Sequence, residues 1–392
     1  MDIIQKDLKN YICNNNSINK IQKNVLKQKQ RNYGIDLLRI FSMINVINLH
    51  INSKAGIFRL NSNNIKFKNM WRLETFSYFA VNCFGLISGI VGFNKYKFSN
   101  LIYLWFISTF YSLSNQLYLY FVKRINIKQI FLSLSFLPIF IKFHWYVNAY
   151  FIMYLFLPFI NFGIASLDKK TFRNIVLFYI IFFSIYYIVS VLFKKPNDHF
   201  LLNGYSSSWL IILYIIGSYF GKYILKSNNN KINWIFFLIN YIGFSFLSSE
   251  IFIITGQKFL ISYLSPTILF QAICLVMIFD SIKITNKYIT KTIKFITPLV
   301  FSATLIHSLL FSSNLKIVLS LFELIKELNN EFLFYKIYIL STIIFLICII
   351  IDYFRLLIFK IVKIRDICLF IERIFPKLID KFLLIINCFL IN

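Results

Sequence analysis

The chain has 392 residues, of which 58% are hydrophobic, 19% aromatic and only 15% charged. Soluble domains are typically about 45–50% apolar, so this composition excludes an ordinary globular protein and indicates several membrane crossings. The net charge of +27 does not predict a nucleic-acid partner, because the Lys and Arg residues are scattered between apolar runs without a recognition motif. Topology signals and attraction to anionic membrane lipid account for this charge.

Residues 1–33 are polar and rich in Asn and Lys, with no apolar core of their own. Such a segment is not a cleaved signal peptide, and it predicts a flexible cytoplasmic tail. The 6 cysteines form no CxxC pair and show no Cys/His spacing typical of zinc. We therefore expect neither a disulfide framework nor a metal site.

Apolar runs recur from residue 34 to residue 352 without a composition break, and a helix needs ~20 mostly apolar residues to cross a membrane. We predict an all-α integral membrane protein, a polytopic bundle of about ten transmembrane helices that forms one domain over 34–352. Residues 51–75 are assigned to an outer loop. Segment 129–141 is short and contains Pro138, which predicts a re-entrant or interfacial segment or, alternatively, an eleventh span. The predicted spans are 34–53, 76–93, 100–121, 145–163, 175–193, 209–224, 233–253, 263–280, 295–313 and 333–352.

Lys and Arg are more frequent in alternate connecting segments, on the side that also holds both ends of the chain. The positive-inside rule therefore places both termini in the cytoplasm. Residues 353–392 mix apolar and basic side chains at helical spacing. This pattern predicts a basic amphipathic tail that lies on the inner membrane face.

The first predicted span, YGIDLLRIFSMINVINLH, carries Asp36, Arg39 and His50 on one helical stripe. Ionisable groups inside a membrane usually face a protein-lined cavity, because exposure to lipid costs several kcal/mol each. Asp36 and Arg39 are explained equally well as a structural pair near the inner interface. His50 has no obvious structural partner in the sequence, which favours a functional role.

Six segments, in order across residues 34–310, resemble those of one family. Arg39 and His50 match its signature of Arg or Lys, ten residues, then His. Ser88 and Gly89 in AVNCFGLISGIVG match the pattern of its second span. The remaining matches are HWYVNAYFIMYLFLPFIN, LYIIGSYFGKY, SPTILFQAICLVMIF and FSATLIHSLLF. The chain therefore resembles the bacterial membrane-bound acyltransferase family 3, which is polysaccharide O-acyltransferase-like.

This resemblance implies an O-acetyltransferase of the bacterial cytoplasmic (inner) membrane. It would move an acetyl or other acyl group from acetyl-CoA to a sugar hydroxyl of a cell-envelope polysaccharide or a lipid-linked glycan. Acetyl-CoA would be a co-substrate, with no bound cofactor. The expected partners are the glycan acceptor, membrane lipid and polysaccharide-biosynthesis proteins.

The resemblance also implies roles for the first span. An imidazole can take a hydroxyl proton near neutral pH, so His50 is expected to act as general base or to carry the acyl group transiently. Arg39 is expected to bind the donor's phosphates or to pair with Asp36, which would then orient it. Many family members carry Arg-x-x-Arg after the second span. This chain has NKYKFSN instead, where Lys95 and Lys97 could contact a nucleotide phosphate without the fork geometry of Arg.

Three further residues are weaker candidates for substrate contact. Ser88 could donate a hydrogen bond, although a Ser-Gly pair more often marks a close helix crossing. Trp145 could stack on a sugar or belong to the aromatic belt of the membrane interface. His307 could be functional or a satisfied packing histidine.

Two rival functions share some of these features. A transporter or flippase of a lipid-linked or surface polysaccharide would also need an inward polar stripe. Transporters often have broken helices in matching halves, but the segment around Pro138 has no counterpart in the second half. A polysaccharide polymerase would usually carry a large outer loop, which the sequence does not predict.

Overall fold

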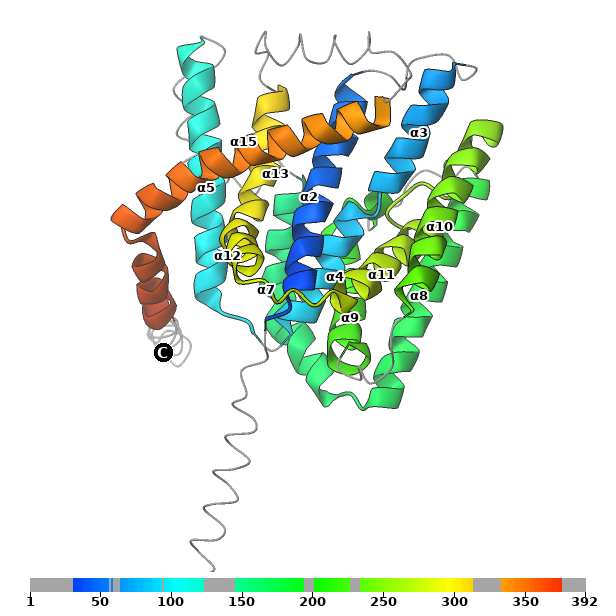
Figure 1. Cartoon of the computed structure of the whole chain (residues 1–392). Coiled ribbons are helices and arrows are strands. Elements are labelled where there is room, and N and C mark those ends of the chain that lie inside the picture. The colour runs from blue at the N-terminus through cyan, green and yellow to red at the C-terminus, as the bar shows by residue number, and fades with distance from the viewer. Residues whose placement is uncertain are drawn as a thin grey trace, which may run out of the picture.

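The computed structural model describes residues 31–55, 58, 64–93, 95–122, 145–193, 201–225, 233–312 and 333–375. Within these ranges every regular element is a helix (Figure 1). The first 30 residues of the predicted tail, segment 129–141 and residues 376–392 lie outside them. The helices are α2 (Tyr33–Lys54), α3 (Ile65–Ser77), α4 (Ala80–Gly92), α5 (Phe98–Phe121), α7 (Trp145–Ser166), α8 (Lys169–Leu192), α9 (Ser207–Tyr219) with a π-helical turn (Phe220–Ile224), α10 (Trp234–Thr255), α11 (Pro266–Ser281), α12 (Lys287–Ile296), α13 (Val300–Ser312) and α15 (Leu333–Ile361).

All ten predicted spans fall on these helices. Seven described stretches are long and apolar enough to cross a membrane, which confirms an all-α, multi-pass membrane protein. The count of ten stays a prediction. The seven stretches are Tyr33–Lys54, Ile65–Gly92, Trp145–Ser166, Lys169–Leu192, Trp234–Thr255, Lys287–Phe311 and Leu333–Ile361.

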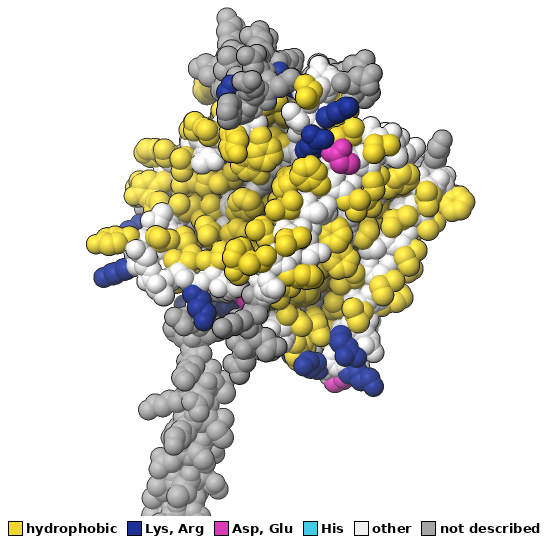
Figure 2. Space-filling model, turned by 45° about the vertical axis from the view of Figure 1, so that its right-hand side comes forward, with side chains coloured by type: hydrophobic (Ala, Val, Ile, Leu, Met, Phe, Trp, Pro, Cys, Tyr) yellow, Lys and Arg dark blue, Asp and Glu magenta, His cyan; other side chains and the backbone are white. Residues whose placement is uncertain are grey.

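Figure 2 shows a broad band of hydrophobic side chains, with most of the visible Lys, Arg, Asp and Glu side chains near its upper and lower edges. Large apolar residues on α8, α10 and α15 are exposed, including Phe178, Ile239 and Ile350. A broad surface of exposed apolar side chains is unfavourable in water but favourable in contact with the hydrocarbon layer of a membrane. The outer helices therefore present a lipid-facing surface.

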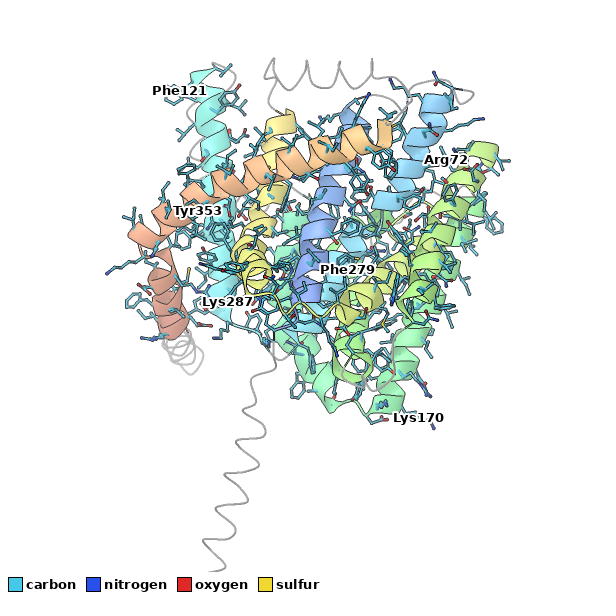
Figure 3. The ribbon with its side chains drawn as sticks, in the orientation of Figure 1. Arg72, Phe121, Lys170, Phe279, Lys287 and Tyr353 are labelled. Atoms are coloured by element: carbon cyan, nitrogen blue, oxygen red, sulfur yellow. The ribbon has the colours of Figure 1, made fainter. Side chains whose placement is uncertain are left out.

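Helix α2 is the centre of the bundle, and it packs against α3, α4, α11, α13 and α15. Its first turn is capped by the side chain of Asn32, which accepts hydrogen bonds from the backbone N–H groups of Gly34 and Ile35. Further along the helix, the ring of Phe41 stacks against Phe79 and Phe279, with centroid distances of 5.7 and 5.6 Å (Figure 3, where Phe279 is labelled). Helix α2 is therefore enclosed by protein rather than lipid.

The predicted outer loop 51–75 is wrong in part, because residues 65–77 form α3 and run almost directly into α4. The Lys, Asn, Arg and Glu side chains of α3 make the segment look like a loop in the sequence. In the structure α3 packs on α10, where Trp71 contacts Phe252 at a centroid distance of 4.0 Å. Arg72 (labelled in Figure 3) pairs with Glu250 of α10 at 2.7 Å.

The predicted boundary at 352/353 lies inside α15, which continues to Ile361. Asp352 and Arg355 are buried there and form an ion pair of 2.7 Å. Tyr111 of α5 donates its hydroxyl to Asp352, and Arg355 donates to Tyr103 of the same helix. Buried charges need such complete pairing, so this cluster ties α15 to α5.

Residues 364–375 form a further helix that contacts the start of α5. Helix α5 has no side-chain cap of its own, and the Glu372 carboxylate accepts a hydrogen bond from the Ser99 N–H at 3.1 Å. Partial burial disfavours the charged carboxylate, but the hydrogen bonds from Ser99 hold the pKa of Glu372 below its usual value. The rest of the prediction for 353–392, a tail on the inner membrane face, stays a prediction.

Helices α4 and α9 cross at glycines. A Cβ atom on Gly89 would meet the carbonyl oxygen of Tyr214 at 2.0 Å, and one on Gly217 would meet that of Leu86 at 2.1 Å. The two helix backbones can approach this closely only because each helix has a glycine at the crossing. The crossing fixes α4 against α9.

We expect Gly89→Ala to lower the free energy of unfolding by about 1–3 kcal/mol, because the added methyl group overpacks the crossing. The measurement is the thermal unfolding midpoint of the purified protein in detergent. Gly243→Ala in α10 is the matched control, since a Cβ there meets nothing within 4 Å. Equal midpoints for the two variants would contradict the close crossing.

Candidate functional site

A cavity of about 500 Å³ opens beside the last two turns of α2. Its wall is formed by α2, α3, α4, α7 and α13, together with Tyr205 before α9 and Tyr263 before α11. His50 and Trp145 line it, as do Glu74 of α3 and Lys54 at the end of α2. It thus brings an imidazole, a carboxyl group and an ammonium group together with several aromatic rings.

His50 is joined to His307 of α13 inside the bundle. The Nδ1 atom of His50 lies 2.9 Å from the Nε2 atom of His307, and the two ring centroids are 4.8 Å apart. The Nδ1 atom of His307 lies 2.6 Å from the carbonyl oxygen of Ala303. His307 is fully buried, whereas His50 is partly exposed at the cavity wall. The structure therefore brings together two histidines that are 257 positions apart in the chain.

The hydrogen bonds assign the tautomers of both rings. A carbonyl oxygen only accepts, so Nδ1 of His307 carries a proton and Nε2 of the neutral ring is an acceptor. His50 must then donate from Nδ1, which leaves the lone pair of its neutral ring on Nε2. Because His50 lines the cavity, its Nε2 is the nitrogen available to a bound molecule. The arrangement can take up a proton or attack an electrophilic carbon.

The carboxyl group of Glu74 is a site residue that the sequence analysis missed. Glu74 is 8% exposed, and its Oε2 atom accepts a hydrogen bond from Nδ2 of Asn52 at 3.0 Å. Asn48 and Asn45 lie on the same side of α2, and they bond to Ser77 of α3 and Tyr338 of α15. Three asparagines at intervals of three and four residues in an apolar helix were the available signal, because they share one face.

Aromatic rings form the wall of the cavity opposite α2. Trp145 packs against Tyr205 and Tyr263 at centroid distances of 4.6 and 6.2 Å, and Tyr263 contacts Tyr78 at 4.9 Å. Because each ring is supported by another, the wall is a continuous aromatic surface. The structure thus places Trp145 at the cavity rather than only in an interfacial belt, and its role in binding a sugar stays a prediction.

Arg39 and Asp36 do not line the described cavity. They lie near the start of α2, and the eleven positions from Arg39 to His50 correspond to about 16 Å along a helix. Arg39 contacts Asp36 at 3.4 Å, and Arg31 contacts the same carboxylate at 2.5 Å. The predicted pairing of Asp36 and Arg39 is present, but Asp36 is shared with a second arginine. The structure separates these charges from His50.

The other predicted residues lie outside the cavity wall as well. The Ser88 hydroxyl donates to the carbonyl of Phe84 on its own helix at 2.7 Å, while the adjacent Gly89 makes the close helix crossing. Lys95 and Lys97 lie between α4 and α5, at the same end of the bundle as the start of α2 (Figure 1). Ser88 therefore fits the packing alternative, and the two lysines remain near Arg39 rather than His50.

Within the described ranges, no group of three His, Cys, Asp or Glu side chains is placed to hold a metal ion. A family model described as an acyltransferase domain matches residues 32–351. Neither the curated proteins nor the solved structures yielded a match to the chain. The matched range includes α2, the cavity and His307.

The assigned tautomers predict different reactivities for the two histidines. Diethyl pyrocarbonate carbethoxylates an unprotonated imidazole nitrogen that it can reach. The unprotonated Nε2 of His50 is available at the cavity, whereas that of the buried His307 is bonded to His50. We therefore expect His50 to react faster than His307 in the native protein. Peptide mass spectrometry after short exposures measures both rates. After denaturation the two rates should converge, and equal rates in the native protein would contradict the assignment.

Proposed function

The chain belongs to the acyltransferase 3 family, and on this basis we propose that it transfers an acetyl group from acetyl-CoA to a sugar hydroxyl. The acceptor in this proposal is a bacterial cell-envelope polysaccharide or its lipid-linked precursor. The observation that carries the proposal is the His50 imidazole, with its available Nε2 at the cavity wall and its Nδ1 bonded to His307. The chain is a multi-pass membrane acyltransferase, and the proposal adds the donor and the acceptor.

In the direct route, Nε2 of His50 removes the proton of the sugar hydroxyl as its oxygen attacks the thioester carbonyl. The carbon–sulfur bond then breaks, the acetyl ester forms, and the coenzyme A thiolate recovers the proton from the imidazolium. In the second route, Nε2 itself attacks the thioester and coenzyme A leaves as a thiolate. The sugar hydroxyl then attacks the acyl-imidazolium, its proton passes to the thiolate, and the bond from the acyl carbon to Nε2 breaks to return the neutral imidazole. Both routes need the lone pair on Nε2.

His307 supports either route as a positioning residue. Its Nε2 accepts a hydrogen bond from Nδ1–H of His50, and its own Nδ1–H donates to the Ala303 carbonyl, which fixes the ring. This holds the His50 ring in one orientation and one tautomer. When Nε2 becomes protonated or acylated, the bond from Nδ1 becomes a charge-assisted one, which stabilises the positive ring.

We place the nucleotide of the donor at the other end of α2, on the cytoplasmic side of the inner membrane. Arg39, Lys95 and Lys97 lie at that end and supply positive charge for phosphates. Coenzyme A carries its thioester on a long flexible arm, away from its phosphates. A separation of about 16 Å between Arg39 and His50 is therefore compatible with one bound donor.

We expect His50→Ala to reduce transfer by about 10²–10⁴-fold, because the variant lacks the base. Arg39→Ala should reduce it by about tenfold or more, through loss of a charge-assisted contact. The measurement supplies radiolabelled acetyl-CoA to membranes at matched protein abundance and counts label in the glycan and glycolipid fraction. Arg173→Ala, at an exposed arginine of α8, is the control for loss of positive charge. If the wild type transfers no label while its deletion changes the amount of surface glycan, export replaces acyl transfer as the function.

We expect His307→Leu to lower kcat at least about tenfold, short of the loss for His50→Ala, because the His50 ring loses its acceptor. The KM for acetyl-CoA should stay near the wild-type value. His307→Gln offers an acceptor oxygen in place of the ring nitrogen and should recover part of kcat. A rise in KM with unchanged kcat would show that His307 contacts the donor rather than positioning His50.

A further inference from the structure

The cavity holds a carboxyl group whose purpose the proposed reaction does not explain. Glu74 projects from α3 into the wall that also contains His50, and it is 8% exposed. Asn52, which is fully buried, donates a hydrogen bond from Nδ2 to the Oε2 atom at 3.0 Å. Among the described residues the structure records no hydrogen bond to the other oxygen, Oε1. Oε1 is not one of the fully buried polar atoms without a partner in the described part of the chain, and Glu74 lines the cavity, so Oε1 can accept a hydrogen bond from a molecule bound there.

Neighbouring cations do not supply that donor. The ammonium group of Lys258 lies 5.0 Å from the centroid of the Trp71 ring. No ion pair between Glu74 and Lys258 or Lys54 is present in the described part of the chain. The unsatisfied oxygen is therefore available to a neutral donor such as a hydroxyl group.

The aromatic wall indicates the shape of such a molecule. Trp145, Tyr205, Tyr263 and Tyr78 present supported ring surfaces to the same cavity as Glu74. Flat apolar surfaces suit the face of a ring, while a carboxylate accepts from the hydroxyl groups at its edge. A ligand ring that stacks on the aromatic wall and also donates a hydrogen bond to Glu74 is fixed in rotation as well as in position.

We propose that Glu74 is a specificity-determining residue for the acyl acceptor. Its Oε1 accepts a hydrogen bond from a second hydroxyl of the acceptor ring, one that is not acylated. This contact turns the reacting hydroxyl toward Nε2 of His50. The inference rests on the proposed function, because it requires a hydroxylated acceptor in this cavity.

The test is Glu74→Gln. The amide oxygen keeps the bond from Asn52, while the NH₂ group that replaces Oε1 can only donate. We expect the acceptor amount for half-maximal labelling to rise about 5–100-fold, as for a buried hydroxyl donor that loses its acceptor. The acetyl-CoA concentration for half-maximal labelling should not change. The probe is a dilution series of the membrane glycan and glycolipid fraction that the wild type labels.

Glu250→Gln is the matched control, because Glu250 pairs with Arg72 outside this cavity. Glu74→Asp keeps a carboxylate but shortens it, and it should also raise the half-maximal acceptor amount; it decides the test if Glu74→Gln does not fold. If the Glu74 variants need the same acceptor amount for half-maximal labelling as the wild type, the assignment is overturned. It is also overturned if only the half-maximal acetyl-CoA concentration changes. A wild type that transfers no label refutes the proposed function instead, which is a separate result.

Discussion

A polar side chain inside the hydrocarbon layer must find its partner within the protein, and this constraint organises the whole bundle around α2. The helix carries polar residues along its length, and each of several neighbouring helices supplies a partner. Helix α3 bonds to Asn48 and Asn52, α13 to His50, and α15 to Asn45. These bonds fix the rotation of α2 about its axis. That rotation is what points His50 at the cavity.

The surrounding helices then divide by what they pack against. Helices α4 and α9 approach closely through Gly89 and Gly217, which completes a dense inner group around α2. Helices α8 and α10 have large apolar side chains exposed to lipid. Between hydrocarbon and apolar side chains there is little hydrophobic driving force, so van der Waals packing and buried hydrogen bonds hold the inner group together. The cavity lies within this inner group, where its wall is best fixed.

Parts of this arrangement were predictable from the sequence because their signals are local. The apolar runs locate the helices, and the spacing of Asp36, Arg39 and His50 indicates an unusual first span. The roles of Glu74, Asp352 and Arg355 were not predictable, because each depends on a partner far along the chain. Glu74 lies in a segment that is polar enough to resemble a loop in the sequence. The structure shows that Asn52 bonds to Glu74 and that the aromatic residues of the same segment pack on α10. Likewise, the sequence suggests that Arg355 is part of a basic tail, whereas in the structure Arg355 is buried and donates hydrogen bonds to Asp352 and Tyr103.

The same distinction explains why His307 was ambiguous and His50 was not. The ring N–H of a histidine on a buried helix face needs only one hydrogen-bond acceptor, and His307 has one in the Ala303 carbonyl of its own helix. That local bond alone would make it a packing residue. It becomes relevant to chemistry because it leaves Nε2 as an acceptor aimed at His50, and the tautomer of one ring then dictates that of the other. Two histidines in series thus place a single basic nitrogen at the cavity, while the charges that suit a nucleotide stay at the other end of α2. The helix thereby separates a region of positive charge from a region suited to proton transfer, and in the function we propose a donor with a long arm joins the two.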